Sequence, residues 1–171
     1  MNIFKDNIKI LFICPGGQTN LNSPSENLAQ HINQNHINIC VDIFNMNFRK
    51  PPNSTKGYDL VWGDMDGGNV PMVAITLAKQ DNIPCYIHGE WIPPFRFEEG
   101  WSSFFKTPTQ IHMKPNYTNN IKAMSQADLV SLAIEGDEGG FNFIKRTTGI
   151  EFKNKFIRFP ASKKYNHLDL P

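Results

Sequence analysis

The stretch that decides the fold is residues 57–91, GYDLVWGDMDGGNVPMVAITLAKQDNIPCYIHGEW. Two short runs rich in strand-forming residues, 59–63 and 84–88, flank an apolar segment over residues 70–79 that has the length and composition of a buried helix. Two strands with a helix between them predict a parallel βαβ unit. Ligands bind beyond the carboxyl ends of the strands in open sheets of this kind. We therefore expect the loops after Gly63 and His88 to share one ligand-binding edge.

The rest of the chain repeats the alternation of strands and helices. Further strands are predicted over residues 8–14, 38–44, 128–134 and 155–159, and further helices after Ser23 and over residues 117–127 and 136–148. The helix after Ser23 has Pro24 and Glu26 in its first turn, which is typical of a helix start. The sequence thus predicts one α/β domain over residues 1–160, built on a single doubly wound, mainly parallel sheet with helices on both faces. Residues 161–171 are predicted to begin a linker or tail.

Composition excludes several classes of function. The 171 residues are 40% hydrophobic and 19% charged, as in soluble globular proteins, and the formal net charge of +1 gives no reason to expect a nucleic-acid partner. No apolar run reaches the roughly 20 residues of a transmembrane helix, and the N-terminus does not read as a secretory signal. The spacing of Cys14, Cys40 and Cys85 fits no zinc site. They are predicted to be small buried side chains in a reducing, cytoplasmic setting.

A pair of glycines follows the first predicted strand. Gly16 and Gly17 precede a helix, and glycines at such a place let backbone amides approach a phosphate. A plain tight turn is the alternative interpretation. The G-x-G-x-x-G fingerprint is missing, and the second strand does not end in an acidic residue, so the sequence disfavours NAD or FAD. The P-loop and the G-x-S-x-G motif are also missing.

Polar residues follow the two strands of the central unit. His88 ends its strand, and an imidazole there can orient or deprotonate a hydroxyl group, or stabilise developing charge. A structural histidine bonded to nearby backbone is the alternative. Asp64, Asp66 and Glu90 are predicted to accept hydrogen bonds from hydroxyl groups of a ligand. The two aspartates could instead cap the helix after Asn69. No third ligand accompanies them, so we expect no metal site.

The segment over residues 92–115 contains four prolines and five large aromatic residues. A long connection without regular structure is usually functional or mobile. We consider two interpretations: a substrate-binding lid, or a cluster of rings that packs beneath the connection.

Six segments in order resemble the N-terminal half of retaining glycosyltransferases of the GT-B fold: KILFICPGG, SPSENLAQHI, YDLVWG, IPCYIHGEW, SQADLVSLAI and KNKFIRFP. The likeness in organisation extends over residues 9–160. It implies a Rossmann-like, acceptor-side domain with strand order 3-2-1-4-5-6. It also implies that Gly16 and Gly17 contact the donor diphosphate and that His88 lies near the reacting sugar. The second Rossmann domain of this family, which binds the nucleotide sugar, does not follow within these 171 residues.

The resemblance leads to an expected function. The chain would be the acceptor-binding half of a retaining glycosyltransferase, inactive until a C-terminal domain or a partner subunit supplies the site for the nucleotide-sugar donor. In such a glycosyltransferase, His88 is the candidate catalytic residue. The residues expected to contact the acceptor are Asp64, Asp66 and Glu90, and no metal or cofactor is expected. One alternative is a non-catalytic α/β module that binds a small ligand or a partner protein at the same edge. Another is a flavodoxin-like redox domain with a bound yellow cofactor.

Overall fold

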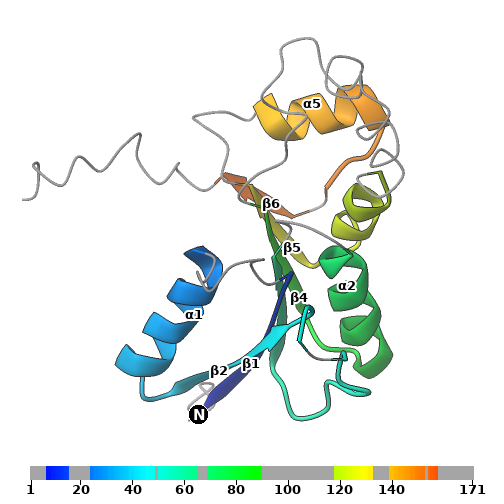
Figure 1. Cartoon of the computed structure of the whole chain (residues 1–171). Helices are drawn as coiled ribbons and strands as arrows, with labels where there is room; N and C mark the ends of the chain where they lie inside the picture. Colours follow the sequence, from blue (N-terminus) through cyan, green and yellow to red (C-terminus); the bar gives the residue numbers. More distant parts are fainter. Residues whose placement is uncertain are drawn as a thin grey trace, which may run out of the picture.

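The computed structural model of the chain describes residues 7–15, 24–48, 50–64, 69–89, 118–132, 139–152 and 154–157 (Figure 1). The elements are β1 (Ile8–Cys14), α1 (Pro24–Asn35), β2 (Ile39–Asn45), β3 (Leu60–Asp64), α2 (Val70–Asp81), β4 (Cys85–Gly89), β5 (Leu129–Leu132), α5 (Gly139–Thr148) and β6 (Lys155–Ile157). A helix over residues 118–124 precedes β5. The predicted alternation of strands and helices is confirmed for these ranges. The predicted connection over residues 92–115 and the predicted tail over residues 161–171 lie outside the described residues.

The strands form one six-stranded sheet in the order β2-β1-β3-β4-β5-β6, and every neighbouring pair is parallel. The expected doubly wound α/β fold is therefore confirmed. The expected strand order 3-2-1-4-5-6 is wrong for the third strand, because β3 pairs with β1 in the register Ile10↔Leu60 instead of lying beyond β2. The direction of winding thus reverses between β1 and β3, where the crevice of a doubly wound sheet lies.

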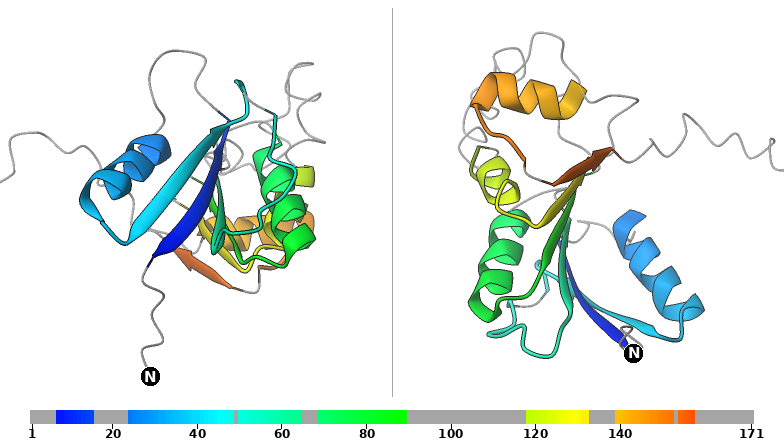
Figure 2. Two further views of the ribbon diagram at one scale, coloured as in Figure 1. Left: turned by 90° about the horizontal axis from the view of Figure 1, so that it is seen from below. Right: turned by 180° about the vertical axis from the view of Figure 1, so that it is seen from behind.

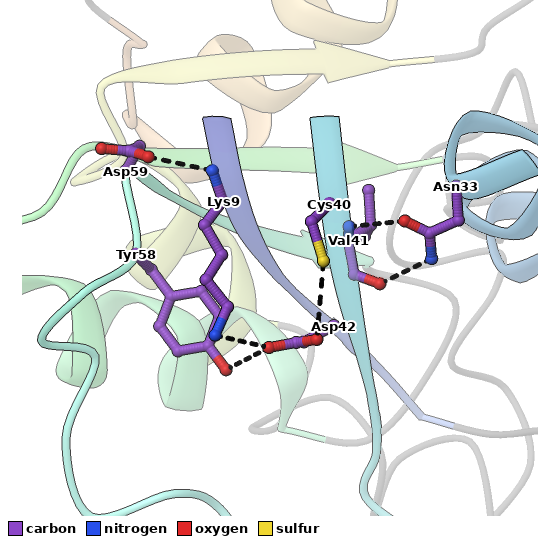
Figure 3. Close-up of polar contacts among 7 residues, drawn as sticks. All are labelled: Lys9, Asn33, Cys40, Val41, Asp42, Tyr58 and Asp59. Carbon is purple, nitrogen blue, oxygen red and sulfur yellow. Dashed lines mark hydrogen bonds and ion pairs between the residues drawn. The ribbon is translucent and has the colours of Figure 1, made fainter. Parts of the chain in front are cut away.

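Two sets of contacts explain the position of β3. The amide side chain of Asn33 occupies the outer edge of β2, donating to the Val41 carbonyl at 2.8 Å and accepting from the Val41 N–H at 2.7 Å (Figure 3). It takes the place that a further strand would need. At the start of β3, the Asp59 N–H donates to the Lys9 carbonyl at 2.7 Å, and the Asp59 carboxylate accepts from the Lys9 N–H at 2.9 Å. Asp59 thereby fixes β3 beside β1.

The helices cover both faces of the sheet. Helix α1 lies on one face, while α2, the helix over residues 118–124 and α5 lie on the other (Figures 1 and 2). Right-handed crossovers that run in opposite directions from β1 and β3 produce this division. The face under α2 holds the larger core cluster, which includes Val61, Ala74 and Ile87. The α1 face holds a smaller cluster that includes Phe12 and Trp62.

Hydrogen bonds and an ion pair hold the connection between β2 and β3 on two sides. Near α2, the Asp81 carboxylate accepts hydrogen bonds from the Ser54 hydroxyl at 2.8 Å and the Thr55 N–H at 2.6 Å. Near β2, the Tyr58 hydroxyl donates to the Asp42 carboxylate at 2.8 Å, and the Lys9 ammonium lies 3.2 Å from the same oxygen (Figure 3). These bonds hold the connection between α2 and the strands β1 and β2.

The cysteines behave differently from one another. Cys14 and Cys85 are buried, as predicted, but Cys40 is exposed, which corrects the prediction for this residue. It lies on the edge strand β2 next to Val41, and because side chains alternate along a strand it faces away from α1, the helix that covers Val41. Burial, and to a smaller extent the charge of Asp128, raise the pKa of the Cys85 thiol to about 12.

Within the described ranges, none of the helices has both the length and the apolar character needed to cross a membrane.

Candidate functional site

Three polar side chains line up across the carboxyl ends of β3, β4 and β5. Asp64 pairs with His88 in the register of β3 and β4, and His88 pairs with Ser131 in the register of β4 and β5. Paired residues of parallel neighbours project from the same face of a sheet. All three are buried, with exposed fractions of 0%, 1% and 0%. We call Asp64, His88 and Ser131 the carboxyl-end row.

The carboxyl-end row lies on the face opposite to α2. Gly63 precedes Asp64 and faces α2, since a Cβ atom added to it would lie 2.9 Å from the Cβ of Ala74 in that helix. Successive residues of a strand point to opposite faces, so Asp64 faces away from α2. The Asp64 side chain therefore projects from the face of the sheet opposite to α2, the helix that it was alternatively expected to cap.

A chain of hydrogen bonds joins His88 to two hydroxyl groups. The Nδ1 atom of His88 lies 2.8 Å from the Ser131 hydroxyl, which in turn lies 2.6 Å from the hydroxyl of Tyr86. Tyr86 comes two residues before His88 on β4 and therefore shares its face of the sheet. Neither Ser131 nor Tyr86 is among the site residues expected from the sequence. The signal for Ser131 was a polar residue inside the apolar run DLVSLAI.

An aromatic band leads across the sheet to His88. Ring centroids are 4.3 Å apart for Phe12 and Trp62, 6.1 Å for Trp62 and Tyr86, and 6.4 Å for Tyr86 and His88. Trp62 is only 5% exposed, and its indole N–H is among the buried polar groups of the described chain that have no hydrogen-bond partner. An unsatisfied buried donor costs about 1–3 kcal/mol, so the indole N–H of Trp62 is a group that needs a partner.

The geometry does not favour a hydrolytic triad, although the chain order is Asp64, His88, Ser131. In a Ser-His-Asp triad the serine bonds to Nε2 of the histidine and the acid to Nδ1. Here Ser131 bonds to Nδ1, and its hydroxyl is fully buried and shared with Tyr86. Ser131 is therefore suited to hold His88 in place and not to attack a substrate.

The other predicted site residues are Gly16, Gly17, Asp66 and Glu90, and all four lie outside the described residues. Before the two glycines, β1 ends at Cys14, and after them α1 begins at Pro24. The first turn of α1 is tied to β2, because the Asn45 amide donates to the Glu26 carboxylate at 3.3 Å. The start of α1 is therefore held at the carboxyl end of β2.

No group of three or more histidine, cysteine, aspartate or glutamate side chains within the described ranges could hold a metal ion. No protein-family model, no curated protein and no solved structure matches this chain. We therefore infer its function from the carboxyl-end row and from the motifs of the sequence.

Proposed function

We propose that this chain is the acceptor-binding half of a retaining glycosyltransferase, and that the carboxyl-end row binds hydroxyl groups of a sugar. The observation that carries the proposal is the alignment of Asp64, His88 and Ser131 across the carboxyl ends of three neighbouring parallel strands. Ligands of doubly wound sheets bind at this edge. The ordered motifs of the sequence, from KILFICPGG to KNKFIRFP, supply the connection to sugar transfer.

The row contains groups that complement a sugar. An ionised carboxylate only accepts hydrogen bonds, so Asp64 suits a hydroxyl hydrogen, whereas the imidazole of His88 can donate to an oxygen. Neighbouring strands lie about 4.8 Å apart, so the two side chains can reach adjacent oxygens of one sugar ring. The indole N–H of Trp62, two residues before Asp64, is a further donor on the same face of the sheet.

Burial supports a catalytic role for His88. Charge that develops on a reacting sugar and its leaving group is stabilised best by preorganised groups that water does not reach. The side chains of the row are at most 1% exposed, and Ser131 fixes His88 from one side. In this proposal His88 contacts the reacting sugar, while Gly16 and Gly17 hold the donor diphosphate and Asp66 and Glu90 contact the acceptor.

The proposal includes the partners of the reaction. The donor is a nucleotide sugar, the acceptor carries a hydroxyl group, and a C-terminal domain or partner subunit completes the donor site. We propose a cytoplasmic location and no nucleic-acid partner, given a net charge of +1. Neither a metal nor a redox cofactor is needed for the transfer.

The experiment compares Asp64, the last residue of β3, with Asp59, which directly precedes that strand. Binding of methyl glucosides, galactosides and mannosides to the purified chain is measured by saturation-transfer NMR. We expect at least one glycoside to bind to the wild type and to the control Asp59→Asn. Asp64→Asn should weaken that binding about tenfold, because a hydrogen bond to a charged group contributes roughly 1.5–3 kcal/mol. His88→Gln should weaken it as well.

Two results would overturn the proposal. One is that no glycoside binds, or that Asp59→Asn and Asp64→Asn bind equally well while both remain folded. The other is sugar transfer by the purified chain alone from UDP-, GDP- or ADP-sugars, since the donor site is proposed to lie elsewhere. Glycoside binding that never leads to transfer, even with a completing domain, would favour the non-catalytic binding module.

The strand order favours a second candidate. The order β2-β1-β3-β4-β5 is that of flavodoxin-like domains, which bind FMN where the winding reverses between the first and third strands, and it differs from the order implied by the resemblance to glycosyltransferases. Fold alone does not fix function, so this candidate needs its own test. A flavodoxin-like chain should purify with the yellow absorption of a flavin or acquire it when FMN is added. A colourless chain that leaves the spectrum of added FMN unchanged would exclude it.

A further inference from the structure

Strand β2 is an edge of the described sheet, with β1 as its neighbour on one side. Edge strands carry a row of backbone groups that can pair with another chain, and native proteins block such edges. We propose that Asn33 keeps this chain monomeric, by occupying backbone groups of β2 with which a second copy of the chain would otherwise pair. The inference does not depend on the proposed function.

Every second residue of β2 directs its backbone groups away from β1. At the start of the strand, the Ile8 N–H donates to the Asn38 carbonyl at 2.8 Å, and just beyond its end the Met46 N–H donates to the Cys14 carbonyl at 3.0 Å. Backbone groups alternate between the two sides along a strand, so the even-numbered residues face β1. The outward residues of β2 are therefore Ile39, Val41, Ile43 and Asn45.

The two ends of this outward edge bond to nearby parts of the chain. The Ile39 N–H donates to the His36 carbonyl at 3.1 Å, in the turn that follows α1. The Asn45 carbonyl accepts from the Phe48 N–H at 3.2 Å, in the turn that follows β2. The middle of β2 is therefore the part that another strand could reach.

Asn33 closes the middle of the edge. Its amide accepts from the Val41 N–H at 2.7 Å and donates to the Val41 carbonyl at 2.8 Å (Figure 3). Two bonds to the N–H and C=O groups of one residue are those that an opposite residue of an antiparallel strand makes. A second strand therefore cannot pair at Val41 until Asn33 leaves. With Val41 occupied, Ile43 is a single outward residue between two bonded ones, which is too little for a strand ladder.

The partner that we expect in the absence of the Asn33 amide is a second copy of this chain. The β2 segment ICVDIFN is rich in β-branched and aromatic residues, which favour strands. Ile37 and Phe48, just beyond the two ends of β2, are 97% and 78% exposed and would be covered by such pairing. A formal net charge of +1 gives little repulsion between copies. Two β2 strands can pair about a twofold axis, which closes the assembly at a dimer.

The test compares the oligomeric state of four proteins by sedimentation velocity over a range of concentrations: the wild type, Asn33→Ala, Asn33→Asp and the control Asn35→Ala. Asn35 lies two residues further along α1, and its amide donates to the His31 carbonyl at 2.9 Å instead of to β2. Alanine favours a helix more than asparagine does, so we expect Asn33→Ala to fold. Circular dichroism checks the folding of each variant.

We expect the wild type and Asn35→Ala to remain monomers, whereas Asn33→Ala should form dimers as its concentration rises. Asn33→Asp also loses the donor to the Val41 carbonyl, but it should remain a monomer because a charge on an edge strand opposes pairing. Hydrogen exchange locates the contact. In the Asn33→Ala dimer, the outward amides of Val41 and Ile43 should both be protected. In the wild type, the Val41 amide should exchange about tenfold more slowly than the Ile43 amide, which has no such side-chain partner within the described ranges.

Four results would overturn the inference. In the wild type, the Val41 amide could exchange as fast as the Ile43 amide, and this result needs no variant. Folded Asn33→Ala could stay monomeric at every concentration, or form a dimer in which the β2 amides are not protected. An Asn33→Ala protein that fails to fold would assign the two bonds to stability instead. A failure to bind glycosides would count against the proposed function and leave the oligomeric state as found.

Discussion

Replacing Gly63 by alanine should destabilise the protein, because β3 and α2 meet at this glycine. An added methyl group would lie 2.7 Å from Cδ1 of Ile87, 2.9 Å from Cβ of Ala74 and 3.6 Å from Cγ1 of Val70. The end of the Ile87 side chain can rotate away. The Cβ of Ala74 is fixed to the backbone of α2, so α2 and β3 must move apart until that contact exceeds 3.0 Å.

The size of the effect can be worked out from these contacts. Overpacking of a well-packed core costs about 1–3 kcal/mol. Alanine also restricts the unfolded chain, which returns about 0.4–1 kcal/mol, so the net loss should be about 1–2 kcal/mol. For a chain of this length the midpoint of thermal unfolding should fall by about 2–8 °C. Urea unfolding followed by circular dichroism measures the free energy directly.

A double-mutant cycle tests the reasoning more sharply. Ile87→Val removes Cδ1 and alone should cost about 0.5–1.5 kcal/mol. Combined with Gly63→Ala it should cost less than the sum of the two, by about 1 kcal/mol, because the alanine methyl fills the vacated space. Gly57→Ala is the control, since its Cβ would meet no atom but its φ of +94° is strained, and Ile87→Val should not rescue it. Additive costs for Gly63→Ala and Ile87→Val would refute the reasoning.

Two further predictions concern titration and reactivity. Burial, followed by the hydrogen bond to Asp42 and its negative charge, raises the pKa of Tyr58 from 10.0 to about 12; the stability that Tyr58 contributes is therefore complete below pH 10 and is lost as the pH rises through 12. The free energy of unfolding of the wild type should fall more steeply over this range than that of Tyr58→Phe, and parallel curves would contradict this. Iodoacetamide should modify exposed Cys40 in the native protein at about pH 8, whereas buried Cys14 and Cys85 should react only after unfolding. Peptide mass spectrometry measures this, and native modification of Cys85 as fast as that of Cys40 would contradict it.

The local elements could be predicted because their signals are local. The apolar run IKILFIC predicted the bounds of β1, and Pro24 with Glu26 after Ser23 predicted the start of α1. The place of β3 could not be predicted in this way. It depends on Asp59 bonding to Lys9 and on Asn33 occupying the edge of β2, and both are contacts between residues far apart or on different elements. The spacing of apolar residues along the sequence carries no information about these two contacts.

The positions of two of the candidate site residues could be predicted for the same reason. The strand patterns placed Asp64 and His88 near the carboxyl edge, and the register of β3 and β4 confirms that they are paired neighbours. The role of Ser131 depends on the register of β4 and β5. A shift of one residue would turn Ser131 to the face under α2, and a run as apolar as DLVSLAI does not reveal which register forms.

The most direct test of the carboxyl-end row as a ligand site is a map of backbone amide shifts during titration with the glycoside that binds best. The account predicts that the largest shifts occur at the ends of β3, β4 and β5, around Asp64, His88 and Ser131. Shifts confined to the opposite end of the sheet, around Lys9, Asp42 and Tyr58, would contradict it.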